Sequence, residues 1–258
     1  QLKLVVGYLV LALLPMLCVI WYNYVRTREM LLADAYQSTE QEAERIQKNF
    51  STMMEPYETV LDVLYVDQML SGYLFADYSR NSYEDMFYYI DKKISEICLM
   101  NGSIHKICFY TNNQTLPQDN YYFYDMKTIE RKNQVVIAEA GGETVLCGMT
   151  GQDSVLSLNR LMNFYPQGGL KSVLTLEIEN DLVQGLLEPL TETDEIYLID
   201  RKGKILASSV TETIGSLITT RIPQKSLESR TQFEFERDDI AKIGNMQNGK
   251  FDTRILVV

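Results

Sequence analysis

The chain holds few residue types that could perform catalysis near neutral pH. Its only histidine, His105, lies in a strand-like pattern, so any Ser-His or Cys-His pair would have to use that one residue. The phosphate-binding patterns G-x-x-x-x-G-K-[ST] and G-x-G-x-x-G do not occur, and neither does the zinc-protease pattern H-E-x-x-H. The sequence therefore predicts no catalytic residues and no enzyme activity in this chain.

The cysteines do not indicate a metal site. Cys18 lies in an apolar segment near the N-terminus, and no C-x-x-C pair occurs, so neither zinc nor a redox dithiol is expected. The spacing of Cys98 and Cys108 allows either a disulfide across the loop at Gly102 or free buried thiols. Neither a metal nor a cofactor is predicted.

Aromatic and basic residues are better suited to binding a ligand. Tyr122 and Tyr124 lie in the segment DNYYFYDM, a loop beside a sheet, where such rings can stack on a sugar or surround an amine. Arg160 lies in an otherwise apolar strand pattern and needs a carboxylate, solvent or an acidic ligand group. Tyr110 ends an earlier strand pattern. We predict these four residues as the ligand-binding site; the alternative is that the rings only pack beneath the loop.

The composition is that of a folded, acidic protein. Of 258 residues, 46% are hydrophobic and 23% are charged, with 24 Lys and Arg against 35 Asp and Glu. This gives a net charge of −11, and an acidic surface repels phosphate backbones. A nucleic-acid partner is therefore not expected.

The N-terminal segment has the pattern of a membrane-spanning helix. Leu4–Val25 holds 22 residues without a charge, close to the ~20 that a helix needs to cross hydrocarbon. Trp21, Tyr22 and Tyr24 cluster near its end, as at a lipid–water interface. A cleaved signal peptide is the alternative, although its apolar region is normally shorter and small residues follow it. We predict a transmembrane helix over residues 1–25.

Charge alone gives one orientation for this helix. Lys3 precedes the apolar segment, whereas Arg26 and Arg28 follow it. Because positive charge accumulates on the cytoplasmic side, this count places the N-terminus outside the cell.

Two helices are predicted next. A long helix over residues 26–72 should continue from the membrane segment, with Pro56 kinking or splitting it. A second helix is expected over Ser82–Met100, with Ser82 as N-cap. The apolar stripe of the first helix has spacings of three and four residues: Ile46, Phe50, Met53, Tyr57, Val60 and Leu64.

The pattern then changes to the period of two that is typical of strands. In 104–111, one face should carry Ile104, Lys106, Cys108 and Tyr110. The hairpin EIYLIDRKGKILASS turns at Asp200–Gly203, because Asp first and Gly fourth suit a type I turn. Other strand-like runs lie at 143–150, 154–165, 170–178, 231–237 and 251–258. The arrangement predicts an α+β fold in which a module over 73–189 is loosely repeated over 190–258.

Three segments, in this order, carry a resemblance to a known family: KICFYTNN, VLSLNRLMNFYPQGGLKSVLTLEIENDLVQGLLEPL and IYLIDRKGKILASSVTETIGSL. With the leading helix, they resemble the extracytoplasmic double Cache region of bacterial sensor histidine kinases of the YesM type. The resemblance implies two PAS-like modules with antiparallel sheets, a membrane-distal one at 73–189 and a membrane-proximal one at 190–258. It also implies an extracytoplasmic location after the membrane helix, opposite to the orientation that charge favours.

The same resemblance implies a function. The distal module would bind a small extracellular ligand or a solute-binding protein, and a homodimer would transmit the signal to a cytoplasmic kinase core that this chain lacks. The Arg, Trp, Tyr and Asp pattern of amino-acid-sensing relatives is incomplete, because Trp21 is the only tryptophan. Two alternatives are the ectodomain of a chemoreceptor and a membrane-anchored scaffold without a small ligand.

Overall fold

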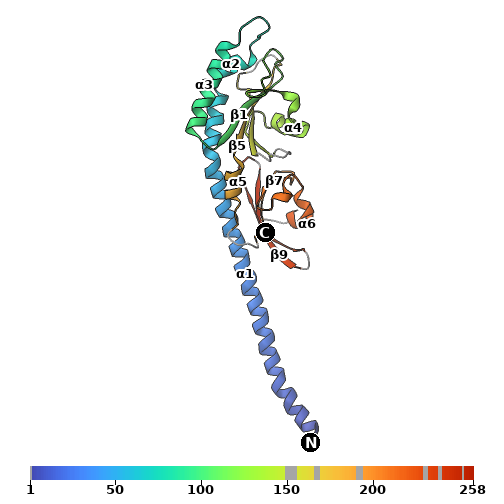
Figure 1. Ribbon diagram of the computed structural model, residues 1–258. Coiled ribbons are helices and arrows are strands. Elements are labelled where there is room, and N and C mark those ends of the chain that lie inside the picture. The colour runs from blue at the N-terminus through green and yellow to red at the C-terminus, as the bar shows by residue number, and fades with distance from the viewer. Residues whose placement is uncertain are drawn as a thin grey trace.

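One long helix, α1 (Leu2–Tyr65), supports the whole molecule (Figure 1). The computed structural model describes residues 2–148, 156–165, 169–189, 194–228, 232–237, 240–251 and 253–258, with side chains from residue 13 onward except at 180, 226, 228, 240 and 241. At ~1.5 Å per residue, the 64 residues of α1 span about 96 Å. Its C-terminal half packs against two sheets, and its N-terminal half projects beyond them.

The prediction that Pro56 splits this helix is wrong. Both Pro15 and Pro56 lie inside α1. Pro56 removes the hydrogen bond to the carbonyl of Thr52, but both residues are exposed, so water can satisfy that carbonyl. The buried face of α1 follows the predicted stripe except at two positions, where Met54 and Leu61 are buried in place of Met53 and Val60.

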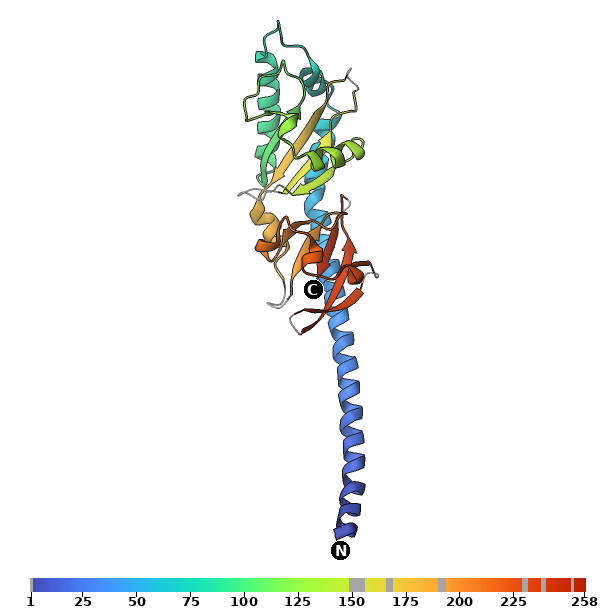
Figure 2. The ribbon, with the colours of Figure 1, turned by 90° about the vertical axis from the view of Figure 1, so that its right-hand side faces the viewer.

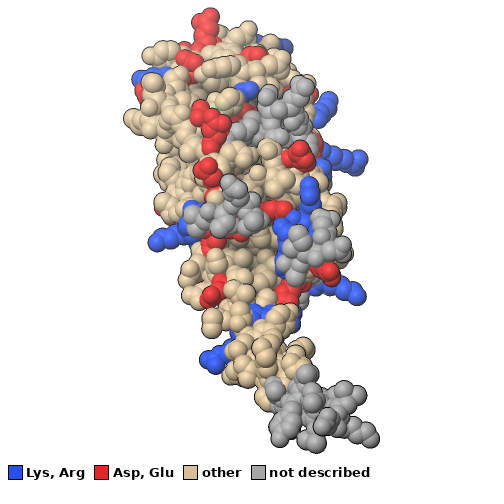
Figure 3. Space-filling view, turned by 60° about the horizontal axis from the view of Figure 1, so that its bottom comes forward, with Lys and Arg blue, Asp and Glu red and all other residues tan. Residues whose placement is uncertain are grey.

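The projecting part of α1 is apolar and bare. Residues 13–25 are all exposed and uncharged, and Figure 3 shows this stretch in tan beyond the charged body. Among the residues whose side chains are described, no helix holds a stretch long and apolar enough to cross a membrane. The predicted transmembrane segment, Leu4–Val25, begins within residues 1–12, whose side chains lie outside the described part.

Two short helices extend the layer that α1 begins. Asp67 caps α2 (Gln68–Phe75) by accepting a hydrogen bond of 3.0 Å from the backbone of Leu70. Its other oxygen accepts bonds of 2.6 Å from Tyr89 and Lys93 on α3 (Glu84–Met100), which ties the two helices together. The N-cap of α3 is Tyr83 rather than the predicted Ser82, whose hydroxyl accepts only a 3.3 Å bond from the backbone of Glu84.

The sheet farther from the N-terminus, here the distal sheet, has the strand order β2-β1-β5-β4-β3. It is antiparallel except that β1 and β2 run parallel, which corrects the prediction of an antiparallel sheet. α1 and α3 lie on one face, and η1 (Met126–Thr128) and α4 (Arg131–Glu139) lie on the other (Figure 2). Its strands are β1 (Ile104–Thr111), β2 (Phe123–Asp125), β3 (Val145–Gly148), β4 (Leu156–Leu161) and β5 (Ser172–Ile178).

The second, proximal sheet follows α5 (Asn180–Leu186) and has the order β7-β6-β10-β9-β8. Numbered within each sheet, both orders read 2-1-5-4-3, so the two halves of the loose repeat expected from the sequence share one strand order. The proximal strands are β6 (Ile196–Ile199), β7 (Ile205–Ser208), β8 (Gln232–Arg237), β9 (Ile240–Asn248) and β10 (Arg254–Val257). Three helical segments lie between β7 and β8 in the chain: η2 (Thr211–Thr213), η3 (Ile218–Thr220) and α6 (Gln224–Glu228).

One core unites both sheets along α1. Its members include Leu146 and Leu176 of the distal sheet and Leu198 and Ile255 of the proximal sheet. β3 approaches β7 closely: a Cβ on Gly148 would lie 3.3 Å from the side chain of Leu206. The two modules therefore pack directly against each other as well as against α1.

A register shift in β1 overturns one predicted face. The pairing with β5 shifts between Ile104 and Lys106. As a result Ile104 lies in the core beside α1 with Ile107 and Phe109, while Cys108 occupies the opposite face. An extra residue in one strand moves every side chain before it to the other face.

Candidate ligand-binding site

The two faces of the distal sheet differ in polarity. In β4, Leu156 and Leu158 belong to the core beside α1, while Ser157 and Asn159 alternate with them and point the other way. In β5, Thr175 likewise lies between two core leucines. The face away from α1 therefore carries buried polar side chains beside a small apolar cluster that includes Cys108 and Val173.

These polar side chains border a cavity beneath α4. Its volume is about 150 Å³, equal to about five water molecules at ~30 Å³ each. A small polar molecule fits such a space. The lining comes from β1, β3, β4, β5 and the segment through η1 and α4: Tyr110, Thr128, Ile129, Glu130, Asn133, Ile137, Cys147, Ser157, Asn159 and Thr175.

Hydrogen bonds fix the floor of this cavity. The Thr175 hydroxyl donates to Asn159 Oδ1 at 2.7 Å, and Asn159 Nδ2 donates to Ser157 Oγ at 3.0 Å. Ser157 Oγ donates to the carbonyl of Cys147 at 3.2 Å. Asn159 and Thr175 are at most 5% exposed. Because these hydrogen bonds already hold the side chains in place, a ligand would meet preorganised donors and acceptors.

An aromatic pair lies at one end of the polar face. The rings of Tyr110 and Tyr124 lie 5.3 Å apart, and the Lys106 ammonium lies 4.5 Å from the Tyr124 ring and hydrogen bonds to its hydroxyl. Burial raises the pKa of Tyr110 above its ordinary range, so its phenol stays protonated and can donate a hydrogen bond.

Burial also raises the pKa of the Cys147 thiol, which lines the same cavity, to about 12. This side chain is therefore not a nucleophile at neutral pH.

The chain matches no family model and no curated protein sequence. Its structure is similar to the ligand-binding domain of the amino acid chemoreceptor PctB of Pseudomonas aeruginosa PAO1 in complex with L-Arg. That match has a TM-score of 0.57 and 16% identity, and it covers 89% of this chain and 94% of the other.

Two further structures are similar. The ligand-binding domain of Campylobacter jejuni chemoreceptor Tlp3 in complex with L-valine gives a TM-score of 0.55 and 12% identity, covering 91% of this chain and 94% of the other. The extracellular domain of the histidine kinase vpHK1S-Z8 gives 0.57 and 14%, covering 88% and 94%. The chain has the fold of these extracellular sensor domains.

Of the four predicted site residues, Tyr110 alone lines the cavity, and the ring of Tyr124 lies against that of Tyr110. Tyr122 is elsewhere: it precedes β2 and lies in the same core as Phe123, the first residue of that strand. It is 6% exposed, belongs to the core beside α1 and α3, and donates to Asp91 at 2.6 Å.

Arg160 also lies on the face toward α1. Its guanidinium forms an ion pair with Asp62, donates to the carbonyl of Gly142 at 2.7 Å and lies 3.8 Å from the ring of Tyr65. Of the three partners that the sequence allowed, a carboxylate is the one present, and α1 supplies it. Arg160 connects the distal sheet to α1.

Sequence reasoning missed Ser157, Asn159, Thr175 and the α4 residue Asn133. A pattern was present in LSLNR and LTLE: small polar residues alternate with leucines in strands that the fold buries on both faces. In the described part of the chain the four cysteines are free, and no group of three or more His, Cys, Asp or Glu side chains could hold a metal ion.

Proposed function

We propose that this chain is the ligand-sensing region of a membrane-bound sensor histidine kinase of the YesM type, with no catalytic residues of its own. The polar cavity of the distal sheet is the observation that carries the proposal. The corresponding face of the proximal sheet is filled by a packed cluster that includes Tyr197, Phe235 and Leu256. The cavity thus lies on this face of the distal sheet, whereas the described residues on this face of the proximal sheet form a packed cluster.

The strand that lines the cavity also supports signal transmission. Asn159 points into the cavity, while the next residue, Arg160, contacts Asp62 and Tyr65 on α1. A ligand that binds one arrangement of β4 better than another would therefore bias the position of α1. The size of the change is limited by the difference in affinity between the two arrangements.

The exposed apolar end of α1 supports membrane attachment. Trp21 and Leu17 are 70% and 61% exposed, and they belong to the uncharged run that reaches Val25. Lipid would cover these side chains. In this proposal Leu4–Val25 is the first transmembrane helix, the two modules are extracytoplasmic, and two copies of α1 associate as a homodimer.

A ligand screen tests the proposal. The full chain in detergent is heated with amino acids, sugars and organic acids, and its unfolding temperature is measured. A ligand at 100 times its Kd adds ~2.7 kcal/mol to the free energy of unfolding. The variant Asn159→Leu fills the cavity and should lose the response, whereas Lys92→Gln on the exposed face of α3 should keep it.

The chemoreceptor alternative has support from PctB and Tlp3, which share the fold. The residues that follow the proximal module in the parent protein distinguish the two outputs: a kinase core or a long methyl-accepting coiled coil. A scaffold without a small ligand would give no shift in the screen for the wild type or either variant. That result would overturn the proposed sensing.

A further inference from the structure

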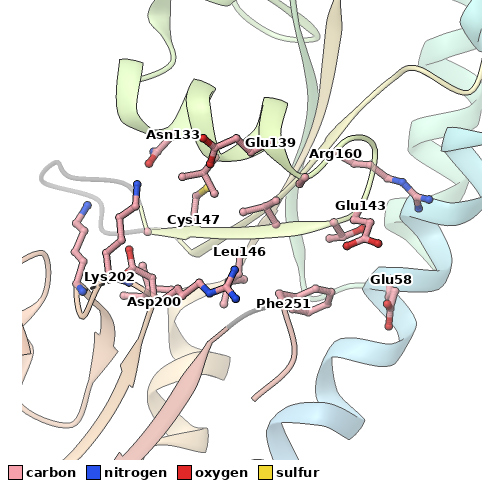
Figure 4. Close-up of a pocket in the computed structure, with 18 of the residues that line it drawn as sticks. Glu58, Asn133, Glu139, Glu143, Leu146, Cys147, Arg160, Asp200, Lys202 and Phe251 are labelled. Carbon is pink, nitrogen blue, oxygen red and sulfur yellow. Dashed lines mark hydrogen bonds between the residues drawn. The ribbon is translucent and has the colours of Figure 1, made fainter. Parts of the chain in front are cut away.

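A second, larger cavity lies between the two modules. Its volume is about 760 Å³, within the ~300–1,000 Å³ typical of small-molecule sites. The floor is buried and comes from Leu146, Cys147 and Gly148 of β3 and Leu206 of β7. Figure 4 shows one wall formed by α4 and the start of β3, with the turn between β6 and β7 opposite.

The two walls carry opposite charges. Glu139, the last residue of α4, and Glu143, just before β3, lie on the distal wall. Lys202 and Lys204 of the β6–β7 turn lie on the proximal wall. None of these four side chains has a hydrogen bond or ion pair within the described part of the chain, whereas the cleft residues Glu58 and Asp62 are already paired with Lys250 and Arg160.

Backbone hydrogen bonds hold the proximal wall in place. Asp200 accepts bonds of 2.8 Å from the amides of Lys202 and Lys204, and the amide of Gly203 donates to the carbonyl of Asp200 at 3.0 Å. Gly203 has φ of 79°, which favours glycine. Asp200 is used by the turn, and the positively charged residues that line this wall are Arg201, Lys202 and Lys204.

The distal wall is fixed as well. Gly142, with φ of 100°, offers its carbonyl to Arg160, and the carbonyl of Gly141 accepts a 3.0 Å bond from Asn163. A Cβ on Gly142 would lie 2.3 Å from the Asn163 side chain, so this tight turn requires glycine. Glu143 follows it directly.

We propose that this intermodule cleft binds a short zwitterionic molecule of the size of a small peptide. Its ammonium faces Glu139 and Glu143, and its carboxylate faces Lys202 and Lys204. Because the walls belong to different modules, the bound molecule links them. Asn133 and Cys147 line both this cleft and the distal cavity, so the two sites share a wall. The proposal does not depend on which ligand the distal cavity binds.

Titration calorimetry with glycine, diglycine, triglycine and tetraglycine tests this. The full chain should show saturable binding that is strongest at one peptide length, because the charges of the probe must reach both walls. Triglycine amide lacks the carboxylate and N-acetyl-triglycine lacks the ammonium, so each should bind at least tenfold more weakly than triglycine.

Variants separate this cleft from other sites. The double substitution Lys202→Gln and Lys204→Gln should weaken peptide binding at least tenfold, and so should Glu139→Gln with Glu143→Gln. Lys92→Gln should bind like the wild type, and Asn159→Leu should too, because it alters the distal cavity alone. An affinity that does not depend on peptide length would overturn the proposal, and so would an affinity that neither double substitution lowers. The absence of any binding would overturn it as well.

Discussion

The two sheets have one strand order, and α1 covers the same face of both, but their opposite faces differ. In the distal sheet that face holds Ser157, Asn159 and Thr175 beneath α4 and leaves a cavity. In the proximal sheet it holds Tyr197, Phe235 and other apolar residues that pack against η3 and α6. The comparison shows how one strand order leaves a cavity in one module and a packed face in the other, depending on the residues at alternate strand positions.

The connection after the first strand also differs. β6 and β7 form a hairpin with a short turn, whereas β1 leads through residues 112–122 to a parallel strand, β2. Parallel pairing requires a long connection. In the distal module this arrangement places Tyr124 beside Tyr110 at one end of the polar face.

The largest expected effect on stability comes from creating a cavity on the packed face of the proximal sheet. Leu256→Ala removes a fully buried side chain from the packed cluster and should lower the free energy of unfolding by about 2–5 kcal/mol. Urea unfolding measures the loss. Leu217→Ala, at a residue 51% exposed, should change stability by no more than about 0.5 kcal/mol. Equal effects of the two substitutions would contradict the packed proximal face.

The converse experiment makes the distal face apolar. Thr175→Val removes the donor to Asn159 Oδ1 and should cost about 1–3 kcal/mol, because a buried acceptor loses its partner. Combining it with Asn159→Leu replaces both partners. The combined loss should be smaller than the sum of the single losses, as measured by a double-mutant cycle in urea. Simple additivity would show that the two side chains do not act as a pair.

Acid should weaken a contact specific to the proximal module. Burial alone would raise the pKa of Glu195, but hydrogen bonds from Arg237 and Tyr197 and the charge of Lys242 lower it from 4.5 to about 2. The carboxylate therefore stabilises the fold above its unfolded pKa, and this contribution is lost as pH falls from about 5 through 2.

Glu195→Gln tests this contribution. It should lose about 1–2 kcal/mol at pH 7, allowing for solvent screening, and should show a smaller fall in stability from pH 5 to pH 2 than the wild type. Unfolding curves across this pH range provide the measurement. Parallel pH profiles of the two proteins would argue against the assigned role of Glu195.

The smallest effect is expected at the link between the distal sheet and α1. Arg160→Lys keeps the positive charge but loses the planar guanidinium that lies over Tyr65. Asp62 is 60% exposed, so stability should fall by less than about 1 kcal/mol. If Arg160 transmits ligand binding, the ligand should change the hydrogen-exchange rates of α1 less in Arg160→Lys than in the wild type. The affinity of the variant for the ligand should be the same as that of the wild type. An unchanged response would remove Arg160 from the transmission path.

The sequence predicted elements where the pattern is local. Alternation located β1, and the Asp and Gly of the turn located the β6–β7 hairpin. It missed β9, whose Gly244 and Asn245 are buried. A strand that packs small and polar residues near α1 has no apolar alternation to recognise. The parallel pairing of β2 was missed for a similar reason, since it depends on a partner distant in sequence.

The site was predicted only in part, because burial is a tertiary property. The sequence by itself determined the α+β class, the long amphipathic helix and the repeat of strand patterns, since each follows from the periodicity of neighbouring residues. Tertiary structure decided that Arg160 faces α1, that Tyr122 enters the core and that Asn159 and Thr175 border a cavity. The reason is that pairing five strands and covering each face fixes which alternate side chains meet a helix and which meet open space.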